Sequence, residues 1–286
     1  MTLVRRLAQA CLALQVLLVV TGTAVRVTGS GLGCPTWPRC TGTSLTNTAE
    51  LGAHGYIEFG NRLLAVLLEV VGIALVIAVR RVPHPRSWTR LALVQAAVVP
   101  LQAVVGGLLV LTGLNPYVLI VHFLASFPLI LGAVALLQRV DAGAVPYGVL
   151  VRRELRWLTG GLVLASSAVL VVGTLVTGTG PHAGDPKVDR LPFDPRDVTQ
   201  LHADLVYLLV GLTLATAVAA RLAGASRSVV RAVSALVGLI VAQGALGYWQ
   251  YYNGVPPLAV GLHVLGATLV FTLAAWAHLA TSGRLP

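Results

Sequence analysis

The stretch "YIEFGNRLLAVLLEVVGIALVIAVRR", residues 56–81, decides the fold. It is mostly apolar, closes on two arginines, and is long enough as a helix to cross a hydrocarbon core of about 30 Å. Its first turns nevertheless carry an acid, an amide and a base, Glu58, Asn61 and Arg62. Polar and ionisable groups are costly inside a membrane, so these three side chains need a reason to be there.

The composition of the whole chain places it in the membrane class. Its 286 residues are 56% hydrophobic and 10% charged, and the mean hydropathy is +0.84. A soluble domain of this length is far less apolar. The net charge of +10 does not indicate nucleic-acid binding, because the basic residues lie in short clusters between apolar runs, as the positive-inside rule predicts. We therefore expect membrane lipid, and no nucleic acid, as a partner.

Eight apolar stretches are long enough to span a bilayer, which predicts an all-α integral membrane protein. The first stretch follows Arg5 and Arg6 and could be mistaken for a signal peptide. Its apolar run continues to Val25 without a clear cleavage site, so we interpret it as a retained helix. The predicted spans are residues 7–27, 56–79, 90–112, 117–138, 156–178, 200–220, 229–250 and 258–280.

The basic clusters predict the orientation of these spans. Most arginines fall on one side of an eight-helix topology, so both termini are expected to be cytoplasmic. The opposite side then holds two long loops, residues 28–55 and 179–199. Most of the remaining polar residues lie in these two loops.

An internal repeat relates the two halves of the chain. "TGSG" at 28–31 recurs as "TGTG" at 177–180, at an offset of 149. Residues of the third and fourth spans recur at an offset of 141: Gln102 and Gln243, Gly106 and Gly247, Gly113 and Gly254, Pro116 and Pro257, and His122 and His263. We expect two pseudo-repeated four-helix bundles of parallel topology, residues 1–139 and 156–286, joined by a cytoplasmic linker at 140–155.

The same offset aligns Asn61 with His202, so each half has one matched position early in its second helix and a histidine early in its fourth. His202 and His263 then face one another at equal depth. Two such histidines in a four-helix bundle suit the axial positions of a haem iron. The alternative is that each histidine only hydrogen-bonds a neighbouring helix. Zinc is less suitable, since no Cys or carboxylate lies at ligand spacing.

The first long loop carries two cysteines in "GSGLGCPTWPRCTG". Cys34 and Cys40 lie on the outer, oxidising side, where paired thiols are expected to form a disulfide. A loop staple and a redox or maturation role both remain open for this pair. Cys11 lies within the first span and is interpreted as an apolar core residue.

These residues resemble the haem A synthases of aerobic respiration over nearly the whole chain. The matching segments are "TGTAVRVTGSGLGCPTWPRC", "IEFGNRLLA", "LIVHFLAS", "QLHADLVY" and "GLHVLGA". The resemblance implies a multi-pass protein of the bacterial plasma membrane. It also implies oxidation of the C8 methyl group of haem O, through an alcohol and a geminal diol, to the formyl group of haem A. A haem O synthase would supply the substrate, the electron donor is unidentified, and a homo-oligomer is left open.

The resemblance also implies roles for individual residues. His202 and His263 would be the axial ligands of haem b in the second half. The first half would bind haem O, with His122 as an axial ligand, and Glu58 is implicated in catalysis. The family commonly has a histidine where this chain has Asn61, so we expect His122 to hold the first haem alone, or with Asn61 nearby as a weak ligand or pocket residue. A degenerate relative without synthase activity is the contrary interpretation.

The repeat independently indicates which half performs chemistry. Glu58 corresponds to Thr199 and Arg62 to Ala203, so only the first half has an ionisable pair beside its ligand position. Glu58 could accept a proton or stabilise a cation during methyl oxidation, or merely pair with Arg62. Arg26 and Arg62 are candidates to contact haem propionates, or to position loops.

Other polar features have weaker interpretations. The loop 179–199 is read as a cap over the second haem and not as a metal site, and no ligand role is expected for three further histidines. The rival functions are a non-catalytic dihaem b-type electron carrier and a repeat-built transporter, the latter usually having a midplane polar site. The loop residues are His182, Asp185, Asp189, Asp194 and Asp197, and the three histidines are His54, His84 and His278.

Overall fold

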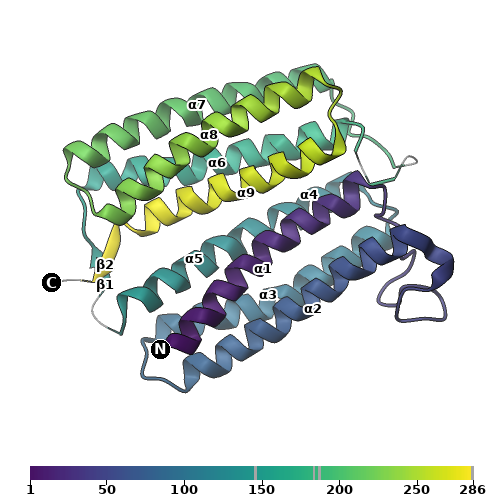
Figure 1. The fold of residues 1–286 in the computed structure, drawn as a ribbon, viewed down its shortest axis with the longest axis horizontal. Coiled ribbons are helices and arrows are strands. Elements are labelled where there is room, and N and C mark those ends of the chain that lie inside the picture. Colours follow the sequence, from purple (N-terminus) through teal and green to yellow (C-terminus); the bar gives the residue numbers. More distant parts are fainter. Residues whose placement is uncertain (145–146, 183, 186–187, 285–286) are drawn as a thin grey trace.

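The computed structural model describes residues 1–144, 147–182, 184–185 and 188–284 (Figure 1). Long helices make up most of it. The elements are α1 (Thr2–Val27), a 3₁₀ turn (Ala49–Leu51), α2 (Gly52–Arg80), α3 (Arg86–Leu111), α4 (Pro116–Leu124), α5 (Ser126–Ala142), β1 (Tyr147–Val149), α6 (Arg153–Thr179), α7 (Pro195–Leu222), α8 (Arg227–Tyr252), α9 (Pro257–Leu279) and β2 (Ser282–Arg284).

Within the described residues, eight helical spans are long and apolar enough to cross a membrane, with α4 and α5 counted as one. This confirms the predicted all-α integral membrane fold. Several helices extend beyond the predicted apolar stretches because capping residues lie outside them. At α7, for example, the Asp194 side chain accepts a hydrogen bond from the Arg196 N–H at 2.7 Å, and Pro195 occupies the first turn.

The fourth span differs from its prediction as one continuous helix, because it divides into α4 and α5 at Ala125. Pro128 lies three residues beyond this division. A proline inside a helix removes one N–H donor and clashes with the carbonyl of the residue four positions earlier, here Leu124. The short helix α4, which carries His122, is thereby separated from the rest of its span.

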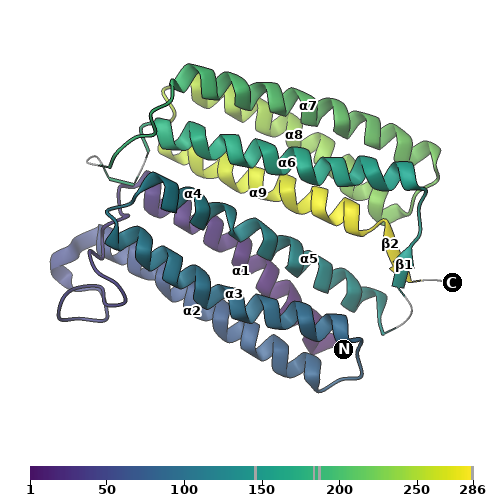
Figure 2. The ribbon, with the colours of Figure 1, turned by 180° about the vertical axis from the view of Figure 1, so that it is seen from behind.

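The spans form two groups, α1–α5 and α6–α9, which lie side by side in both views (Figures 1 and 2). Contacts between the groups run mainly from α1 and α5 to α9. The rings of Phe127 and Phe271 meet edge to face, with centroids 5.2 Å apart. The Gln138 amide donates to the Trp276 carbonyl at 2.9 Å. Aromatic packing and a polar clamp thus join the two groups.

The buried positions follow the predicted repeat. Most buried residues of α2 have a buried counterpart in α7 at the offset of 141. Most buried residues of α3 have a buried counterpart in α8 at the same offset. The coincident buried residues of α2 are Leu68, Gly72, Leu75, Val76 and Val79, and those of α7 are Leu209, Thr213, Thr216, Ala217 and Ala220. The two groups therefore pack their second and third spans with the same helical faces.

The first spans are related by a different register. Buried residues of α1 match those of α6 at an offset of 151, and not at the 149 of the "TGSG" and "TGTG" motifs. The matched pairs are Val4 and Leu155, Ala8 and Thr159, Cys11 and Leu162, Gln15 and Ser166, Val19 and Leu170, and Thr23 and Thr174. This register also pairs Gly22 with Gly173, which matters for the site described below.

Both chain ends lie at one end of the molecule, and the two long loops lie at the other (Figure 1). We call these the terminal end and the loop end. At the terminal end, β1 and β2 form an antiparallel pair with Tyr147 opposite Arg284. The sequence did not predict this pairing, which ties the linker between the helix groups to the C-terminal segment.

Candidate haem-binding site

His202 of α7 and His263 of α9 face one another at the loop end of the second group. Their ring centroids are 6.4 Å apart and their planes differ by 62°. Two imidazoles that bind one metal ion from opposite sides, each at about 2 Å, place their centroids about 6 Å apart. The pair therefore has the spacing of two axial ligands of one iron.

The seven histidines fall into two sets by their hydrogen bonds. His122, His202 and His263 have a buried Nδ1 with no hydrogen-bond partner among the described residues. The other four each have a ring nitrogen at hydrogen-bond distance from a partner: His54 from the Ser30 hydroxyl, His84 from the Val82 carbonyl, His182 from the Val255 carbonyl, and His278 from the Thr159 hydroxyl. The hydrogen bonds of the second set fit structural roles, whereas the first set has, within the described residues, no side-chain partner that would compete with a bound metal ion.

Each of these three histidines packs against a glycine of a neighbouring helix. A Cβ atom built on Gly106 would lie 3.2 Å from His122 Cε1, one on Gly173 would lie 3.3 Å from His202 Cε1, and one on Gly247 would lie 3.4 Å from His263 Cε1. The absence of a side chain at these positions brings helix backbone against the edge of each imidazole. The glycines thereby fix the ring positions.

This contact gives a first prediction. Replacing Gly173 by valine should displace the His202 ring, because even a methyl group there is in tight contact. We expect second-half haem binding to weaken by roughly tenfold or more, the scale for lost support of a metal ligand, as measured by haem titration of the purified apoprotein. Gly238→Val on α8 is the matched control, since a Cβ there meets no atom within 4 Å. An unchanged affinity in Gly173→Val would contradict the packing role.

In the first group, α4 holds His122 next to α3. The Gln102 amide nitrogen donates to the His122 carbonyl at 3.1 Å and lies 3.5 Å from the Ser126 hydroxyl. Asn61 of α2 occupies the position that matches His202. Its Oδ1 accepts a hydrogen bond from the Thr21 hydroxyl of α1 at 2.7 Å.

Glu58 and Arg62 hold the first long loop in place. Glu58 is only 5% exposed, and its Oε2 accepts a hydrogen bond from the Cys34 N–H at 2.6 Å. Its Oε1 pairs with the Arg62 guanidinium at 2.5 Å. Arg62 also donates to the carbonyls of Cys34, Thr36 and Arg39 at 3.1–3.2 Å. Both terminal nitrogens of Arg62 are thus engaged by Glu58 and the loop.

The loop itself is closed by the predicted disulfide between Cys34 and Cys40, and both cysteines are fully buried. Between them, Trp37 lies against α3, where a Cβ on Gly107 would overlap its indole ring. Trp37 was not singled out from the sequence; the glycine pair "GG" at 106–107 is the only signal that could have suggested a close approach. Cys11 is a buried free thiol, as predicted.

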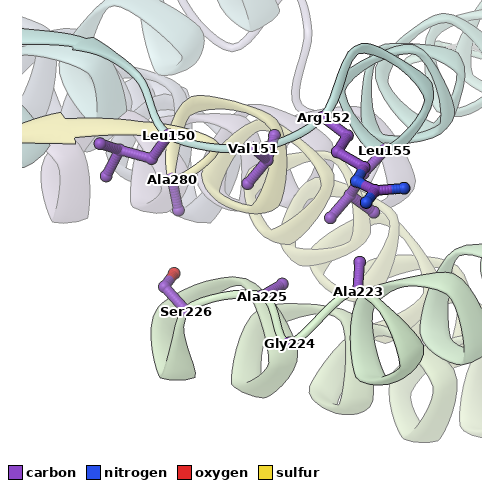
Figure 3. A pocket seen from close by; sticks show the side chains of 9 residues that line it. All are labelled: Leu150, Val151, Arg152, Leu155, Ala223, Gly224, Ala225, Ser226 and Ala280. Carbon is purple, nitrogen blue, oxygen red and sulfur yellow. The ribbon is translucent and has the colours of Figure 1, made fainter.

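Arg26 lies in the last turn of α1, where its side chain approaches Gly184 of the second long loop. No group of three or more His, Cys, Asp or Glu side chains that could hold a metal ion occurs among the described residues, which includes much of loop 179–199. A cavity of about 340 Å³ lies at the terminal end, between the linker and the turn from α7 to α8 (Figure 3). It lies at the opposite end of the helix groups from His122, His202 and His263.

A second set of polar side chains, not predicted from the sequence, lies along α1, α2 and α3 of the first group, further from the loop end than Glu58 and Asn61. Gln15 donates to Gln95, and the Gln95 amide donates to the Leu129 carbonyl at 3.2 Å. Glu69 has a buried carboxylate oxygen without a partner among the described residues. Each of these side chains interrupts an apolar run, which was a sufficient signal to find them.

Taken together, a membrane-spanning helical bundle with facing, half-buried histidines is the arrangement expected of a transmembrane haem protein. Comparison with known families agrees with this class. The model of the COX15-CtaA family, described as cytochrome oxidase assembly protein, matches residues 5–184, and the chain belongs to this family.

Several curated relatives carry the name Heme A synthase, and three of them show the range of similarity. The protein of Lysinibacillus sphaericus is 30% identical over 168 residues, 57% of this chain and 54% of the relative. That of Geobacillus thermodenitrificans is 27% identical over 216 residues, 71% and 68% of the two chains. That of Staphylococcus carnosus is 27% identical over 267 residues, 89% and 86% of the two chains. The matched region thus spans about half of the first relative and most of the third.

Proposed function

We propose that this protein is a haem A synthase, which oxidises the C8 methyl group of haem O to a formyl group. The observation that carries the proposal is the asymmetry between the halves. Both halves share the repeat-related ligand positions, but only the first has the buried Glu58 with its partner Arg62. A dihaem electron carrier would need no such difference. The family and the names of its relatives support the same function.

The two halves would hold different haems. The facing pair His202 and His263, with unpartnered Nδ1 atoms, fits a resident haem b in the second half, residues 156–286. When bound there, this haem supplies one-electron transfer. His122 fits an axial ligand of the substrate haem O in the first half, residues 1–139. The cytoplasmic linker is assigned to residues 140–155.

In the first half, Cys34 and Arg62 fix the position of the Glu58 carboxylate. Both carboxylate oxygens of Glu58 are hydrogen-bonded, one to the Cys34 N–H and one to Arg62, so the carboxylate is held in one orientation. Oxidation of a methyl to a formyl group breaks C–H bonds of the methyl carbon, and a carboxylate fixed beside the substrate could take up a proton from that carbon. Arg62 holds Glu58 and the loop, which leaves Arg26 as the better candidate for contact with a haem propionate.

The cellular setting follows from this function. The protein is a multi-pass membrane protein, and we place its termini in the cytoplasm and its disulfide loop outside. A haem O synthase would deliver the substrate through the membrane. An electron donor is also required, and association into a homo-oligomer is compatible with the apolar outer faces of the helices.

The function is tested on the full chain purified in detergent. Haem O is supplied with a reductant in air, and the haems are then extracted and separated by chromatography. We expect haem A to appear with time, and haem b to remain bound. Haem b alone, with no haem A formed from added haem O, would instead identify a dihaem electron carrier. The His122→Leu variant is the control for a reaction that needs the first-half site.

A further inference from the structure

Asn61 presents a hydrogen-bond donor, and not a metal ligand, at its ligand position. Its Oδ1 is engaged by the Thr21 hydroxyl at 2.7 Å, which is the shortest contact that this hydroxyl makes; the carbonyls of Leu17 and Leu18 are 3.0 and 3.3 Å away. The amide oxygen is the only atom of the side chain that could bind a metal ion. Because that oxygen accepts from Thr21, the Nδ2 hydrogens on the other side of the amide carbon are the part of the side chain that faces away from Thr21.

Helix α1 leaves a space next to Asn61 at Gly22. In the second group the His202 ring fills the corresponding space at Gly173 of α6. The register of α1 and α6 pairs Gly22 with Gly173, whose built Cβ is 3.3 Å from the His202 ring. A Cβ on Gly22 meets no atom of another described segment within 4 Å. The glycine that would pack against a histidine is therefore present, but the shorter Asn61 does not reach it.

The repeat that relates the two halves also indicates which way the Asn61 side chain points. His202 and His263 face one another at 6.4 Å, and α2 and α7 bury the same faces. Asn61 and His122 occupy the corresponding places in the first half. A haem held by His122 would then have an axial position on its Asn61 side that no side chain fills.

We infer that Asn61, oriented by Thr21, donates a hydrogen bond to a small exogenous ligand, the size of water or a diatomic molecule, at the open axial position of the first-half haem. This inference rests on the proposed function only in taking the first half to bind a haem. It assigns Asn61 a positioning role that the histidine at this position in the family pattern could not have while bound to iron. Thr21 belongs to the site because it fixes which end of the amide is presented.

Carbon monoxide is the probe, read by infrared spectroscopy of the reduced protein loaded with haem in both halves. A second-half haem held by both His202 and His263 would leave no position for carbon monoxide and should bind none. A donor beside the bound molecule withdraws electron density toward its oxygen and lowers the C–O stretching wavenumber. We expect this band to shift to a higher wavenumber in Asn61→Leu and in Thr21→Val. Thr23→Val should leave it unchanged, because the Thr23 hydroxyl donates to the Val19 carbonyl of its own helix at 2.9 Å.

Two results would overturn the inference: no carbon monoxide adduct in the wild type, or the same wavenumber in the wild type and both variants. Asn61→His should abolish the adduct by filling the axial position, and an adduct that persists there also argues against the assignment. The second-half haem spectrum reports folding in every variant. If the band shifts as expected but haem A is never formed, the synthase proposal fails while the role of Asn61 stands.

Discussion

Glu58→Gln is expected to lower haem A formation by on the order of 100-fold or more, the usual contribution of a general base, while the second-half haem spectrum stays unchanged. Glutamine has nearly the same shape, and its amide oxygen can still accept the Cys34 N–H, so the disulfide loop should keep its place. The variant loses the ability to take up a proton next to the substrate, and also the ion pair with Arg62. Arg62 keeps its bonds to the loop carbonyls of Cys34, Thr36 and Arg39. The measurement is haem extraction and chromatography after incubation with haem O.

Glu69→Gln provides the matched control for this variant. Glu69 lies on the same helix, eleven residues further along, and among the described residues it forms no hydrogen bond or ion pair with the disulfide loop or Arg62. We expect it to form haem A at close to the wild-type rate. If Glu58→Gln were equally active, Glu58 would be only the structural partner of Arg62 and the loop, and the assignment of a catalytic acid to the first half would be wrong.

The spans and their repeat were predictable because each depends on local pattern. An apolar run of sufficient length specifies a membrane helix whatever its neighbours are. The offset of 141 appeared in glutamine, glycine, proline and histidine residues, and the same offset relates the buried residues of α2 and α7. Leu75 and Thr216, for example, are both fully buried. Residues at the same repeat position therefore occupy the same place in each bundle.

The features that were not predicted depend on contacts between distant segments. The division of the fourth span at Ala125 follows from Pro128, but its effect on His122 could be seen only with Gln102 of α3 beside it. The pairing of Tyr147 with Arg284 joins residues that no local pattern relates. The register of α1 and α6, an offset of 151 between buried residues, differs by two residues from the offset of the "TGSG" and "TGTG" motifs, so the motifs alone do not give it.

The sequence predicted the histidines of the candidate site more fully than the polar contacts around them. His202 and His263 were paired from the repeat, and the structure brings them together. The sequence did not determine the role of Arg62, since haem propionates and loop carbonyls can both accept hydrogen bonds from a guanidinium. Only the folded loop shows that Cys34, Thr36 and Arg39 supply the acceptors.

His263→Leu is expected to remove the resident haem from the second half, and His202→Leu should do the same. Each variant leaves one imidazole facing a side chain that cannot bind iron, so the six-coordinate spectrum should disappear while a haem bound through His122 is retained. His278→Leu is the matched control on the same helix as His263. Its ring nitrogen lies 3.2 Å from the Thr159 hydroxyl at the terminal end, and losing that hydrogen bond should cost only about 1 kcal/mol of stability.

Comparison of the three variants separates ligation from packing. Both ligand variants should lose the same haem, because either histidine alone leaves one axial position without a protein ligand, whereas the control should keep both haems. Haem content per chain and the reduced absorption spectrum measure this directly. If His263→Leu kept the six-coordinate haem, the 6.4 Å separation of the two rings would reflect helix packing alone, and the resident haem would have to be sought on other side chains. If His278→Leu also lost a haem, the effect would be a general loss of bundle stability, since His263 and His278 lie fifteen residues apart on α9, about 22 Å at 1.5 Å per residue.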